Sequence, residues 1–464
     1  MRYVSTRGRA SALGFDDVLL AGLAADGGLY VPETWPTFSA TEWNALAKLD
    51  YPSLAAKIIA PYVAGSVIEK EIAALTAQAY ANFTHKAVAP LVQLDSQLWL
   101  MELFHGPTLA FKDYALQLVG QLFDRVLKAR RQRITIVGAT SGDTGSAAIE
   151  ACRDRDAIDI FILHPAGRVS DVQRRQMTTV TSANVHNIAV AGTFDDCQNA
   201  VKEMFADVSF RDELHLSAVN SINWARIMAQ IVYYAWAALR LGAPARPVAF
   251  AVPTGNFGNV FAGYAAQRMG LPIVKFIVGS NRNDILTRYF ETGSMTASQV
   301  LPSLSPSMDI QISSNFERLL FDAYGRNGAT VASLMERFKQ GGAYTVDPSA
   351  HRAIMAGFEG HRLDDEGTKA TIKSIHAATG QILDPHSVIG VHAAARSKVE
   401  PGTPIVALAT AHPAKFPDAV EAAMGQRPAL PAKLAGLMDK PEKFTQLPND
   451  LGQLKAFVRQ YARR

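Results

Sequence analysis

A single lysine interrupts a largely apolar stretch, "LFHGPTLAFKDYALQLVG", which covers residues 103–120. Lys112 follows Phe111 and precedes Asp113. Such a lysine can extend its ammonium from a helix into solvent, or it can lie in a dry pocket, where desolvation favours the neutral amine. A neutral amine is a nucleophile that forms Schiff bases with carbonyl compounds. The choice between these two interpretations depends on the rest of the sequence.

Two glycine-rich segments follow apolar runs, at points where a strand would turn into a helix. "GATSGDTGSAA" covers residues 138–148 and follows "ITIV", and "PTGNFGNVFAG" covers residues 253–263 and follows "VAFAV". At such a junction the free N–H groups and the dipole of the helix favour an anion, and glycine lets the backbone approach it closely. Either segment alone is explained equally well as a tight turn, because turns of this composition are common.

Neither segment matches the common nucleotide or nucleophile patterns. A Walker A loop ends in Gly-Lys-Ser/Thr, and neither segment has that lysine. Gly138, Gly142 and Gly145 are spaced wrongly for the dinucleotide fingerprint. Ser141 stands one residue too late for a G-x-S-x-G nucleophile elbow. The missing fingerprint disfavours a dinucleotide-dependent oxidoreductase.

Two anion sites beside one reactive amine match the chemistry of pyridoxal phosphate. The aldehyde of this cofactor reacts with a lysine amine, and its phosphate suits a glycine-rich helix N-terminus. An amino-acid substrate brings a carboxylate for the second loop. The protein then has to position the cofactor and to tune its ring.

Short apolar runs alternate with amphipathic stretches from about residue 91 onward. The runs suit strands that are buried on both faces, and their alternation with helices predicts parallel α/β sheets. The predicted strands lie within residues 133–140, 158–164, 183–190, 247–255, 273–280 and 404–410. The predicted helices lie within residues 145–155, 169–177, 194–207, 259–270, 283–290 and 416–424.

The helix that follows Lys112 has a clear periodicity. Apolar residues recur at helical spacing between residues 116 and 127. Gly106 and Pro107 break the chain just before it, and Thr108 can cap the helix. Lys112 is therefore expected in or near the first turn of a buried helix.

The chain divides into four predicted parts, with a long helix at 222–242 between the two α/β regions. Residues 293–307, rich in Ser, Thr and Pro, are predicted to form a loop. The prolines after Gly425 predict an extended tail with a final short helix near residues 451–462. The predicted parts are a mostly helical N-terminal domain (1–90), a smaller α/β domain with Lys112 and the 138–148 loop (91–242), a larger α/β domain with the 253–263 loop (243–425), and a C-terminal extension (426–464).

The composition excludes several classes of protein. The 464 residues include 46 basic and 42 acidic side chains, and a net charge of +4 is too small for a nucleic-acid-binding face. The chain has only two cysteines, Cys152 and Cys197, which argues against a disulfide framework and favours a reducing compartment. With no apolar run of about 18 residues and no signal-peptide pattern, a cytoplasmic protein is expected. The histidines show no metal-binding spacing, so no metal is expected.

Seven motifs, spread over nearly the whole chain, identify a family. They are "STRG" (5–8), "DGGLYVPE" (26–33), "FHGPTLAFKD" (104–113), "GATSGDTGSAA" (138–148), "PTGNFGN" (253–259), "DPHSVIGVHAA" (384–394) and "ATAHPAKF" (409–416). In this order they resemble threonine synthase, a pyridoxal-phosphate enzyme of the tryptophan-synthase-β-like fold. The resemblance implies an α/β fold with two doubly wound parallel-sheet domains and a mostly helical N-terminal domain.

The resemblance also implies the residues that bind the cofactor. Lys112 would hold pyridoxal phosphate as a Schiff base, and Thr410 would place its hydroxyl at the pyridine nitrogen. A neutral hydroxyl at this position, unlike an aspartate, does not enforce a protonated ring. The residues that would cradle the cofactor phosphate are Gly255, Asn256, Phe257, Gly258 and Asn259.

The substrate implied by the resemblance is O-phosphohomoserine, as a small-molecule partner of a monomer or a small homo-oligomer. Ser141, Gly142, Asp143 and Thr144 match the loop that holds the substrate carboxylate. Many relatives of this fold carry asparagine where Asp143 stands, facing the ring hydroxyl of the cofactor. The substrate phosphate needs its own donors, and the candidates are Ser221, Asn223, Arg226 and Thr108. Arg226 can clamp a phosphate with two hydrogen bonds; its alternative role is a solvated charge on the long helix.

The implied reaction converts O-phosphohomoserine and water to L-threonine and phosphate, by γ-elimination and β-addition. Lys112 would shuttle the Cα and Cβ protons, because it is tethered on that face of the substrate. One alternative is a lyase of the same fold that forms a 2-keto acid and ammonia from a (phospho)hydroxy-amino acid. Another is a protein that kept the fold and binds the cofactor without turnover; the intact Lys112 and 255–259 segment argue against it.

Overall fold

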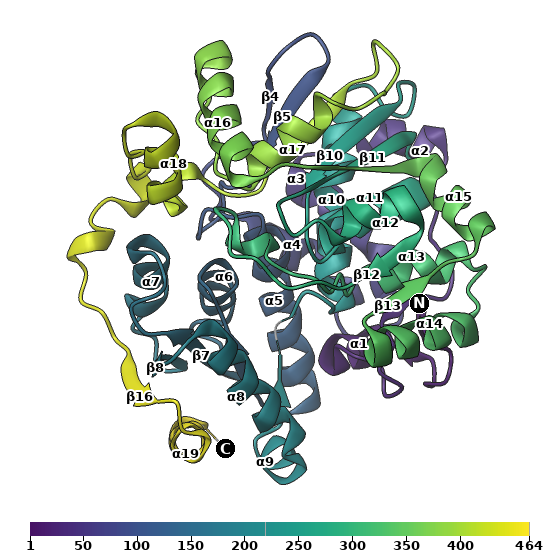
Figure 1. The fold of residues 1–464 in the computed structure, drawn as a ribbon. Helices are drawn as coiled ribbons and strands as arrows, with labels where there is room; N and C mark the ends of the chain where they lie inside the picture. Colours follow the sequence, from purple (N-terminus) through teal and green to yellow (C-terminus); the bar gives the residue numbers. More distant parts are fainter. Residues whose placement is uncertain (219, 464) are drawn as a thin grey trace.

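Two parallel sheets, placed at opposite ends of the molecule, organise the chain (Figure 1). The computed structural model describes residues 1–218 and 220–463. Helices α5 (Lys112–Arg130) and α10 (Trp224–Arg240) lie between the sheets and contact each other. Every residue of α10 from Trp224 to Leu239 is buried, which explains why its sequence is apolar on all sides.

The larger sheet has the strand order β14-β11-β10-β15-β5-β4. All neighbouring strands are parallel except β4 and β5, which pair in the antiparallel sense. Its strands are β4 (Leu91–Gln93), β5 (Leu98–Glu102), β10 (Val248–Pro253), β11 (Ile273–Ser280), β14 (Phe358–Arg362) and β15 (Ile405–Ala409). The helices associated with it are α11 (Gly258–Arg268), α12 (Ile285–Thr292), α15 (Pro348–Gly357), α16 (Asp365–Thr379), α17 (Ser387–Ala394) and α18 (Pro417–Met424).

The smaller sheet is parallel throughout, in the order β16-β8-β7-β6-β9. Its strands are β6 (Ile134–Ala139), β7 (Ile158–Pro165), β8 (Val185–Ala191), β9 (Leu216–Ser217) and β16 (Thr445–Pro448). Its helices are α6 (Asp143–Cys152), α7 (Asp171–Thr178), α8 (Phe194–Ala206), α9 (Val208–Glu213) and α19 (Leu451–Tyr461). All eight residues of β7 are buried, as expected for a strand covered on both faces.

The N-terminal region is mostly helical and also contains a small antiparallel sheet in the order β2-β1-β3. Its elements are β1 (Arg2–Ser5), β2 (Leu13–Gly14), α1 (Phe15–Ala21), β3 (Tyr30–Pro32), α2 (Ala40–Leu46), α3 (Tyr51–Ile59) and α4 (Ile72–Tyr80). Tyr51 packs its ring against those of Tyr114 in α5 and Trp236 in α10, at 6.1 and 5.5 Å between centroids. This region therefore supports the two central helices.

The structure refines the segment that was predicted as a loop. Residues 293–307 contain the short strand β12 (Ser294–Thr296), which pairs with β13 (Ala343–Thr345), and the start of a 3₁₀ turn at Pro306–Met308. The pairing partner lies far along the chain, so local composition could not indicate it. The helices that follow are α13 (Phe316–Ala323) and α14 (Gly328–Gly341).

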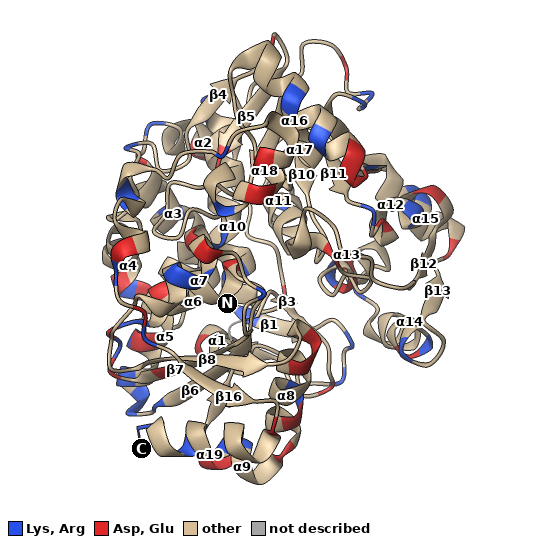
Figure 2. Ribbon diagram, turned by 60° about the vertical axis from the view of Figure 1, so that its left-hand side comes forward, with Lys and Arg blue, Asp and Glu red and all other residues tan. Residues whose placement is uncertain are grey.

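The sheets do not follow the four predicted parts of the chain. Strands β4 and β5 belong to the larger sheet, although they lie within predicted part 91–242. Strand β16 pairs with β8, so the predicted C-terminal extension completes the smaller sheet. In the view of Figure 2 the two sheets occupy separate halves, and basic and acidic side chains are interspersed over both. No helix in residues 1–218 and 220–463 is long and apolar enough to cross a membrane.

Candidate active site

Lys112 is the first residue of α5, and it lies where segments from both sheets meet. The Phe111 N–H donates to the carbonyl of Thr410, directly after β15, at 2.8 Å. On the other side, Nζ of Lys112 lies 3.6 Å from Oδ2 of Asp143, the first residue of α6. Lys112 is 8% exposed. The lysine predicted to react is therefore buried between the ends of β15 and β6.

Burial lowers the pKa of Lys112, because dry surroundings disfavour its charged form. The carboxylate of Asp143 opposes this shift, whereas the positive charges of Lys415 and Arg226 add to it. The net pKa lies below the ordinary value for a lysine. A larger fraction of neutral amine follows, and this form attacks a carbonyl or accepts a proton.

Asp143 is a buried carboxylate with three polar partners. Its Oδ1 accepts a hydrogen bond from Nε2 of Gln173 at 2.9 Å and lies 3.0 Å from Nζ of Lys415. Burial alone would raise the pKa of Asp143, but the charges of Lys415 and Lys112 outweigh this effect and hold the pKa well below its usual range. Asp143 is therefore ionised and presents Oδ2 toward Lys112.

The loop before α6 is held by Thr140, whose hydroxyl accepts hydrogen bonds from the Gly142 and Gly145 N–H groups at 3.0 and 2.9 Å. Gly142 has a φ of 144°, and a Cβ there would lie 2.5 Å from the side chain of Gln173. The hydroxyls of Ser141 and Thr144 take part in no hydrogen bond within residues 1–218 and 220–463. They are half-buried and free to bind a ligand.

The glycine loop at 253–259 is held by a brace, residues 313–315, which donate hydrogen bonds to its backbone carbonyls. The Ser313 hydroxyl donates to the carbonyl of Gly255 at 2.7 Å, and the Asn315 N–H donates to the carbonyl of Asn256 at 3.1 Å. Phe257 stands at the N-cap of α11 with a φ of 62°. Since these carbonyls face the brace, the loop and the first turn of α11 offer their N–H groups to an anion.

Close packing explains the glycines of this loop. A Cβ on Gly255 would lie 2.9 Å from the Ile310 side chain, and one on Gly258 would lie 3.1 Å from Nδ2 of Asn315. Asn259 points its side chain elsewhere: its Oδ1 accepts hydrogen bonds from the hydroxyls of Tyr233 and Tyr234 at 2.6 and 2.9 Å. Its Nδ2 is buried and has no hydrogen-bond partner among the described residues, so the two tyrosines orient Asn259 and leave this donor unpaired.

Thr410 is positioned by a chain of buried hydrogen bonds. Its N–H donates to the hydroxyl oxygen of Ser387 at 2.8 Å, and the Ser387 hydroxyl donates to Oδ1 of Asp384. The other carboxylate oxygen of Asp384 accepts a hydrogen bond from Nδ1 of His386 at 2.8 Å. No described residue hydrogen-bonds to the Thr410 hydroxyl, which leaves it available to a ring nitrogen.

Arg226 is buried on α10 at 4% exposure, which rules out the alternative of a solvated surface charge. No carboxylate within residues 1–218 and 220–463 pairs with it, and its Nε is buried without a hydrogen-bond partner. Burial lowers the pKa of Arg226 to about 10. Proteins rarely bury a guanidinium without a counterion, so Arg226 is a candidate for binding an anion.

Three protein-family models match successive parts of the chain. Residues 2–80 match the model "Threonine synthase N terminus", residues 84–359 match "Pyridoxal-phosphate dependent enzyme", and residues 387–458 match "Threonine synthase, C-terminal". The threonine synthase of Pseudomonas aeruginosa is 56% identical over 100% of this chain and 99% of its own length. The chain belongs to the threonine synthase family.

Solved structures of the family agree with this assignment. Pyridoxal-phosphate-bound threonine synthase from Brucella melitensis is 55% identical, with a TM-score of 0.98 over 100% of both chains. Threonine synthase from yeast is 39% identical, with a TM-score of 0.95 over 99% of this chain and 98% of its own. The tryptophan-synthase-β-like α/β architecture and the helical N-terminal region that the sequence predicted are thereby confirmed.

The cofactor of this family, pyridoxal phosphate, fits the described side chains. The lowered pKa of Lys112 suits an amine that must react with an aldehyde. The glycines at positions 255 and 258 leave no room for a side chain, as suits a loop whose backbone approaches a phosphate closely. The Thr410 hydroxyl has no other partner among the described residues. The enzyme is a pyridoxal-phosphate-dependent threonine synthase by family.

Other predicted substrate residues are engaged within the protein. The Thr108 hydroxyl donates to Oδ1 of Asp113 at 2.7 Å. Asn223 caps α10 by accepting from the Ala225 N–H at 3.0 Å, and its Nδ2 donates to the carbonyl of Leu19 at 2.8 Å. The carbonyl of Ser221 accepts from Asn315, while its hydroxyl has no partner among the described residues. These bonds give Thr108 and Asn223 structural roles.

Sequence reasoning missed three polar residues that surround Asp143, namely Lys415, Gln173 and Gln176. Lys415 lies within the quoted motif "ATAHPAKF", but a single lysine there gives no spacing that indicates its partners. It is fully buried, and Gln173 and Gln176 are 6% and 8% exposed. Glutamine has no strong pattern of its own, so only the packing of α7 against α6 reveals these two residues.

The histidines of the motifs take structural positions. Nε2 of His105 lies 2.8 Å from Oε2 of Glu102, and Nε2 of His386 accepts from the Ser307 N–H at 3.2 Å. Burial lowers the pKa of His412 to about 4. Within residues 1–218 and 220–463, no group of three or more His, Cys, Asp or Glu residues could hold a metal ion. Cys152 and Cys197 are buried free thiols.

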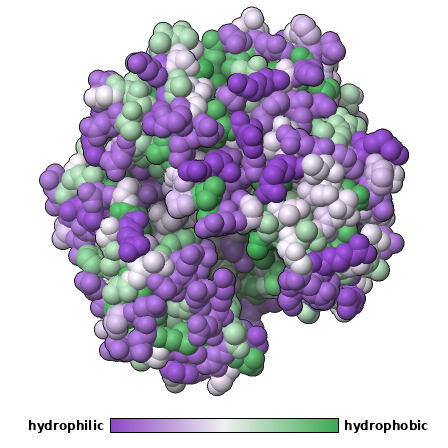
Figure 3. Space-filling model, in the orientation of Figure 1, coloured by the Kyte–Doolittle hydropathy of each residue, from purple (hydrophilic) through white to green (hydrophobic). Residues whose placement is uncertain are grey.

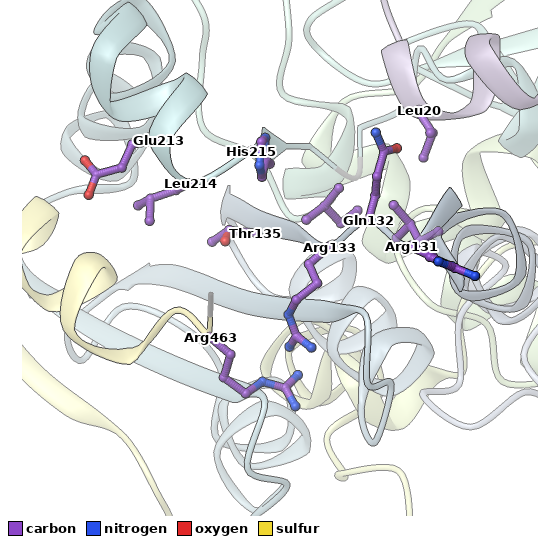
Figure 4. A pocket seen from close by; sticks show the side chains of 11 residues that line it. Leu20, Arg131, Gln132, Arg133, Thr135, Glu213, Leu214, His215 and Arg463 are labelled. Atoms are coloured by element: carbon purple, nitrogen blue, oxygen red, sulfur yellow. The ribbon is translucent and has the colours of Figure 1, made fainter. Parts of the chain in front are cut away.

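Two hollows distinguish this surface. In the orientation of Figure 1, the space-filling view is hollowed between the part that carries α8 and the part that carries α14 (Figure 3). A separate cavity of about 530 Å³ lies at the start of β6, where Thr135, Leu214 and Arg463 line it (Figure 4). Lys112 faces the opposite end of β6, so this cavity is not part of the active site.

Proposed function

We propose that this enzyme converts O-phosphohomoserine and water to L-threonine and inorganic phosphate. The observation that carries the proposal is Arg226, a buried guanidinium with no carboxylate partner among the described residues. Its positive charge adds to the lowering of the Lys112 pKa, so Arg226 lies within electrostatic reach of that amine. A site with a reactive amine and two glycine loops already accounts for a cofactor phosphate and a substrate carboxylate. A third anion site suits a substrate that carries its own phosphate.

Each anion has a preferred place in this proposal. The cofactor phosphate binds the N–H groups of residues 255–259, because that loop has no charged side chain and faces its carbonyls toward the brace. The substrate carboxylate binds the 141–144 loop, where the hydroxyls of Ser141 and Thr144 have no other partner among the described residues. The substrate phosphate binds Arg226, with the Ser221 hydroxyl as a second donor. Thr108 and Asn223 support these groups from behind.

Pyridoxal phosphate, when bound, withdraws electrons from the substrate and so makes its Cα and Cβ protons acidic. Lys112 anchors the cofactor and then acts as the base that takes the Cα proton. Lys112 passes this proton on before it takes the Cβ proton, and the γ-phosphate then leaves toward Arg226 with the electrons of its bond to Cγ. Water adds a hydroxyl group at Cβ. Of the three protons released, from Cα, Cβ and water, one goes to Cγ, one returns to Cα and one leaves on the phosphate. Tethering on α5 keeps Nζ of Lys112 within reach of the neighbouring carbon atoms, which is what a proton shuttle requires.

The test is a phosphate-release assay on O-phosphohomoserine with identification of the organic product. Equal amounts of threonine and phosphate are the expected result. Release of 2-oxobutyrate with ammonia would instead identify a lyase of the same fold. Protein that is loaded with cofactor and releases no phosphate would refute the proposed function.

Further parts of the proposal concern the whole chain. We place the enzyme in the cytoplasm, which the two buried free thiols support. A monomer or small homo-oligomer without nucleic acid or membrane partners is expected, and light scattering of the purified protein tests this. The proposed division of the chain into functional parts remains 1–90, 91–242, 243–425 and 426–464. Within it, β4 and β5 of the second part join the larger sheet, and β16 of the last part joins the smaller sheet.

A further inference from the structure

Lys415 is a second lysine of the active site, and it is completely buried. It ends the 3₁₀ turn Pro413–Lys415, which follows β15 of the larger sheet. Its Nζ donates to the carbonyl of Thr108 at 2.6 Å and to Oε1 of Gln176 at 3.0 Å. It also lies 3.0 Å from Oδ1 of Asp143. Both Asp143 and Gln176 belong to helices of the smaller sheet.

These three contacts engage the whole donor capacity of a lysine ammonium. An ammonium has three N–H donors, and three acceptor oxygens lie within 3.0 Å of this Nζ. A neutral amine would offer only two donors and would turn its lone pair toward an oxygen. The contacts of Lys415 therefore suit an ammonium, whereas Nζ of Lys112 has a single polar neighbour among the described residues, at 3.6 Å.

We propose that Lys415 is a positioning residue of the reaction: a fixed cation that locks the 140–144 loop and α7 onto the larger sheet and sets the charge balance at the Lys112 nitrogen. The inference rests on the proposed function and deepens it. Lys415 touches no reacting atom; it acts through its own positive charge and by holding Asp143 in place. Its absence from the predicted site residues reflects only the lack of a sequence pattern.

The charges that face Lys112 come from three elements. Asp143 on α6 contributes the negative charge, while Lys415 on the 3₁₀ turn and Arg226 on α10 contribute positive charges. His386 faces Asp143 from the segment before α17. With Gln173 and Lys415 both on Oδ1, Asp143 can only accept a hydrogen bond at Oδ2. An asparagine at this position would be able to donate one, so it is only the Asp143 carboxylate, and not the rest of the loop, that is restricted to accepting.

The same lysine helps to join α7 to the segment that precedes α5. Gln176 donates its Nε2 to the carbonyl of Thr108 at 3.1 Å, so Lys415 and Gln176 share that carbonyl. Helix α7 is also held by the C-terminal segment, because Nε of Arg174 lies 2.9 Å from Oε2 of Glu442. Lys415 therefore fixes one side of α7, and the tail fixes the other.

The experiment is a pH titration of the visible absorbance of the cofactor-loaded enzyme, which reports protonation at the Lys112 nitrogen. Lys415→Met removes a positive charge, so the midpoint should rise by about one pH unit. Asp143→Asn removes the carboxylate and leaves Lys415, so the midpoint should fall by a similar amount. The variant that carries both substitutions should have a higher midpoint than Asp143→Asn alone. The difference should equal the shift that Lys415→Met causes in the unmodified enzyme.

The double variant keeps the test decisive if Lys415→Met alone does not fold, because no buried carboxylate is then left unpaired. A purely structural lysine would lower the melting temperature and leave every midpoint in place, and that result would overturn the inference. Lys433→Met is the matched control, because Lys433 also links distant segments, by donating to the carbonyl of Asn82 at 2.8 Å. The titration midpoint of the Lys433→Met enzyme should equal that of the unmodified enzyme.

No step of the titration uses substrate, so the two ideas fail separately. Loaded enzyme that does not convert O-phosphohomoserine, but whose midpoints shift as expected, refutes only the proposed function. Enzyme that makes threonine, but whose midpoints do not move, refutes only the role of Lys415.

Discussion

The two glycine loops, 140–145 and 255–258, have the same local design but differ in charge, because only the first contains a charged side chain. Each follows a buried parallel strand and opens a helix. The first carries Asp143, which is surrounded by Lys112, Lys415 and Gln173. The second has no charged side chain, and backbone and side-chain donors from residues 313–315 brace it.

The difference shows what each loop can respond to. A loop made of backbone N–H groups binds a phosphate with fixed dipoles that do not depend on pH. A loop with a buried ion pair changes when either partner changes its charge. The first loop is therefore suited to the side of the site where protons move, and the second to a permanent anchor.

The largest expected effect on activity comes from replacing Lys112, whose Nζ lies 3.6 Å from Asp143 of the charged loop. Lys112→Ala should lower the turnover number by roughly 10⁴-fold or more, because both the covalent anchor and the base are lost. Reduction of the loaded enzyme with borohydride should trap the cofactor on a peptide that contains Lys112, and the variant should give no adduct. A trapped peptide with another lysine would show that the site has been misassigned.

The second prediction uses pH to separate the loops. The folded-state pKa of Asp143 lies below its unfolded value, so the folded enzyme binds fewer protons in acid. Its stabilisation is present above a pH of about 4 and is lost as the pH falls further. At pH 7, Asp143→Asn should melt about 5 °C or more below the unmodified enzyme, because Lys415 loses its counterion.

This difference in melting temperature should narrow as the pH is lowered from 5 toward 3, since only the unmodified enzyme loses a charge at Asp143. Asn256→Ala in the other loop is the matched control, and its difference should stay constant with pH. If the melting temperature of Asp143→Asn lies below that of the unmodified enzyme by the same amount at pH 7 and pH 3.5, the ion pair does not stabilise the fold.

The features that the sequence predicted are those encoded within short stretches. The alternation of apolar runs and helices, the buried helix that starts at Lys112, and both glycine loops follow from spacing and composition. Lys415 was missed because its partner Gln176 is 239 positions away, and nothing in either local sequence points to the other. The sequence also did not predict which sheets β5 and β16 join, because pairing with strands far along the chain decides this.

Arg226 shows an intermediate case. The sequence placed a basic residue on a long apolar helix and left two roles open, a phosphate clamp or a solvated charge. Helical periodicity cannot distinguish them when the helix is apolar on all sides. Burial at 4% exposure decides against the solvated role, because it depends on how the N-terminal helices and α5 cover α10.

The third prediction tests this guanidinium. Arg226→Met should lower kcat/KM for O-phosphohomoserine by about ten- to a hundredfold, since a charge-assisted hydrogen bond contributes roughly 1.5–3 kcal/mol. The melting temperature should not fall, because an unpaired buried charge is removed rather than a satisfied one. Arg240→Met, at the exposed end of the same helix, should keep kcat/KM within about twofold.

Inorganic phosphate gives an independent readout for the same variant. It should inhibit the Arg226→Met enzyme less than the unmodified enzyme, while the visible absorbance of the cofactor stays normal. Unchanged efficiency together with unchanged phosphate inhibition would move the phosphate site elsewhere, first to Ser221 and Thr108.

The smallest expected effects compare neutral donors of the two loops. Ser141→Ala removes one uncharged hydrogen bond to the substrate carboxylate, so KM should rise by about two- to tenfold with the cofactor retained. Asn256→Ala should leave KM nearly unchanged and speed the loss of cofactor during dialysis, because the side-chain amide that can donate to the cofactor phosphate is lost while the backbone bond from Asn315 stays. Both variants should melt close to the unmodified enzyme, since neither side chain has a hydrogen-bond partner among the described residues. If Ser141→Ala sheds cofactor and Asn256→Ala raises KM, the carboxylate and the cofactor phosphate occupy the opposite loops from those assigned.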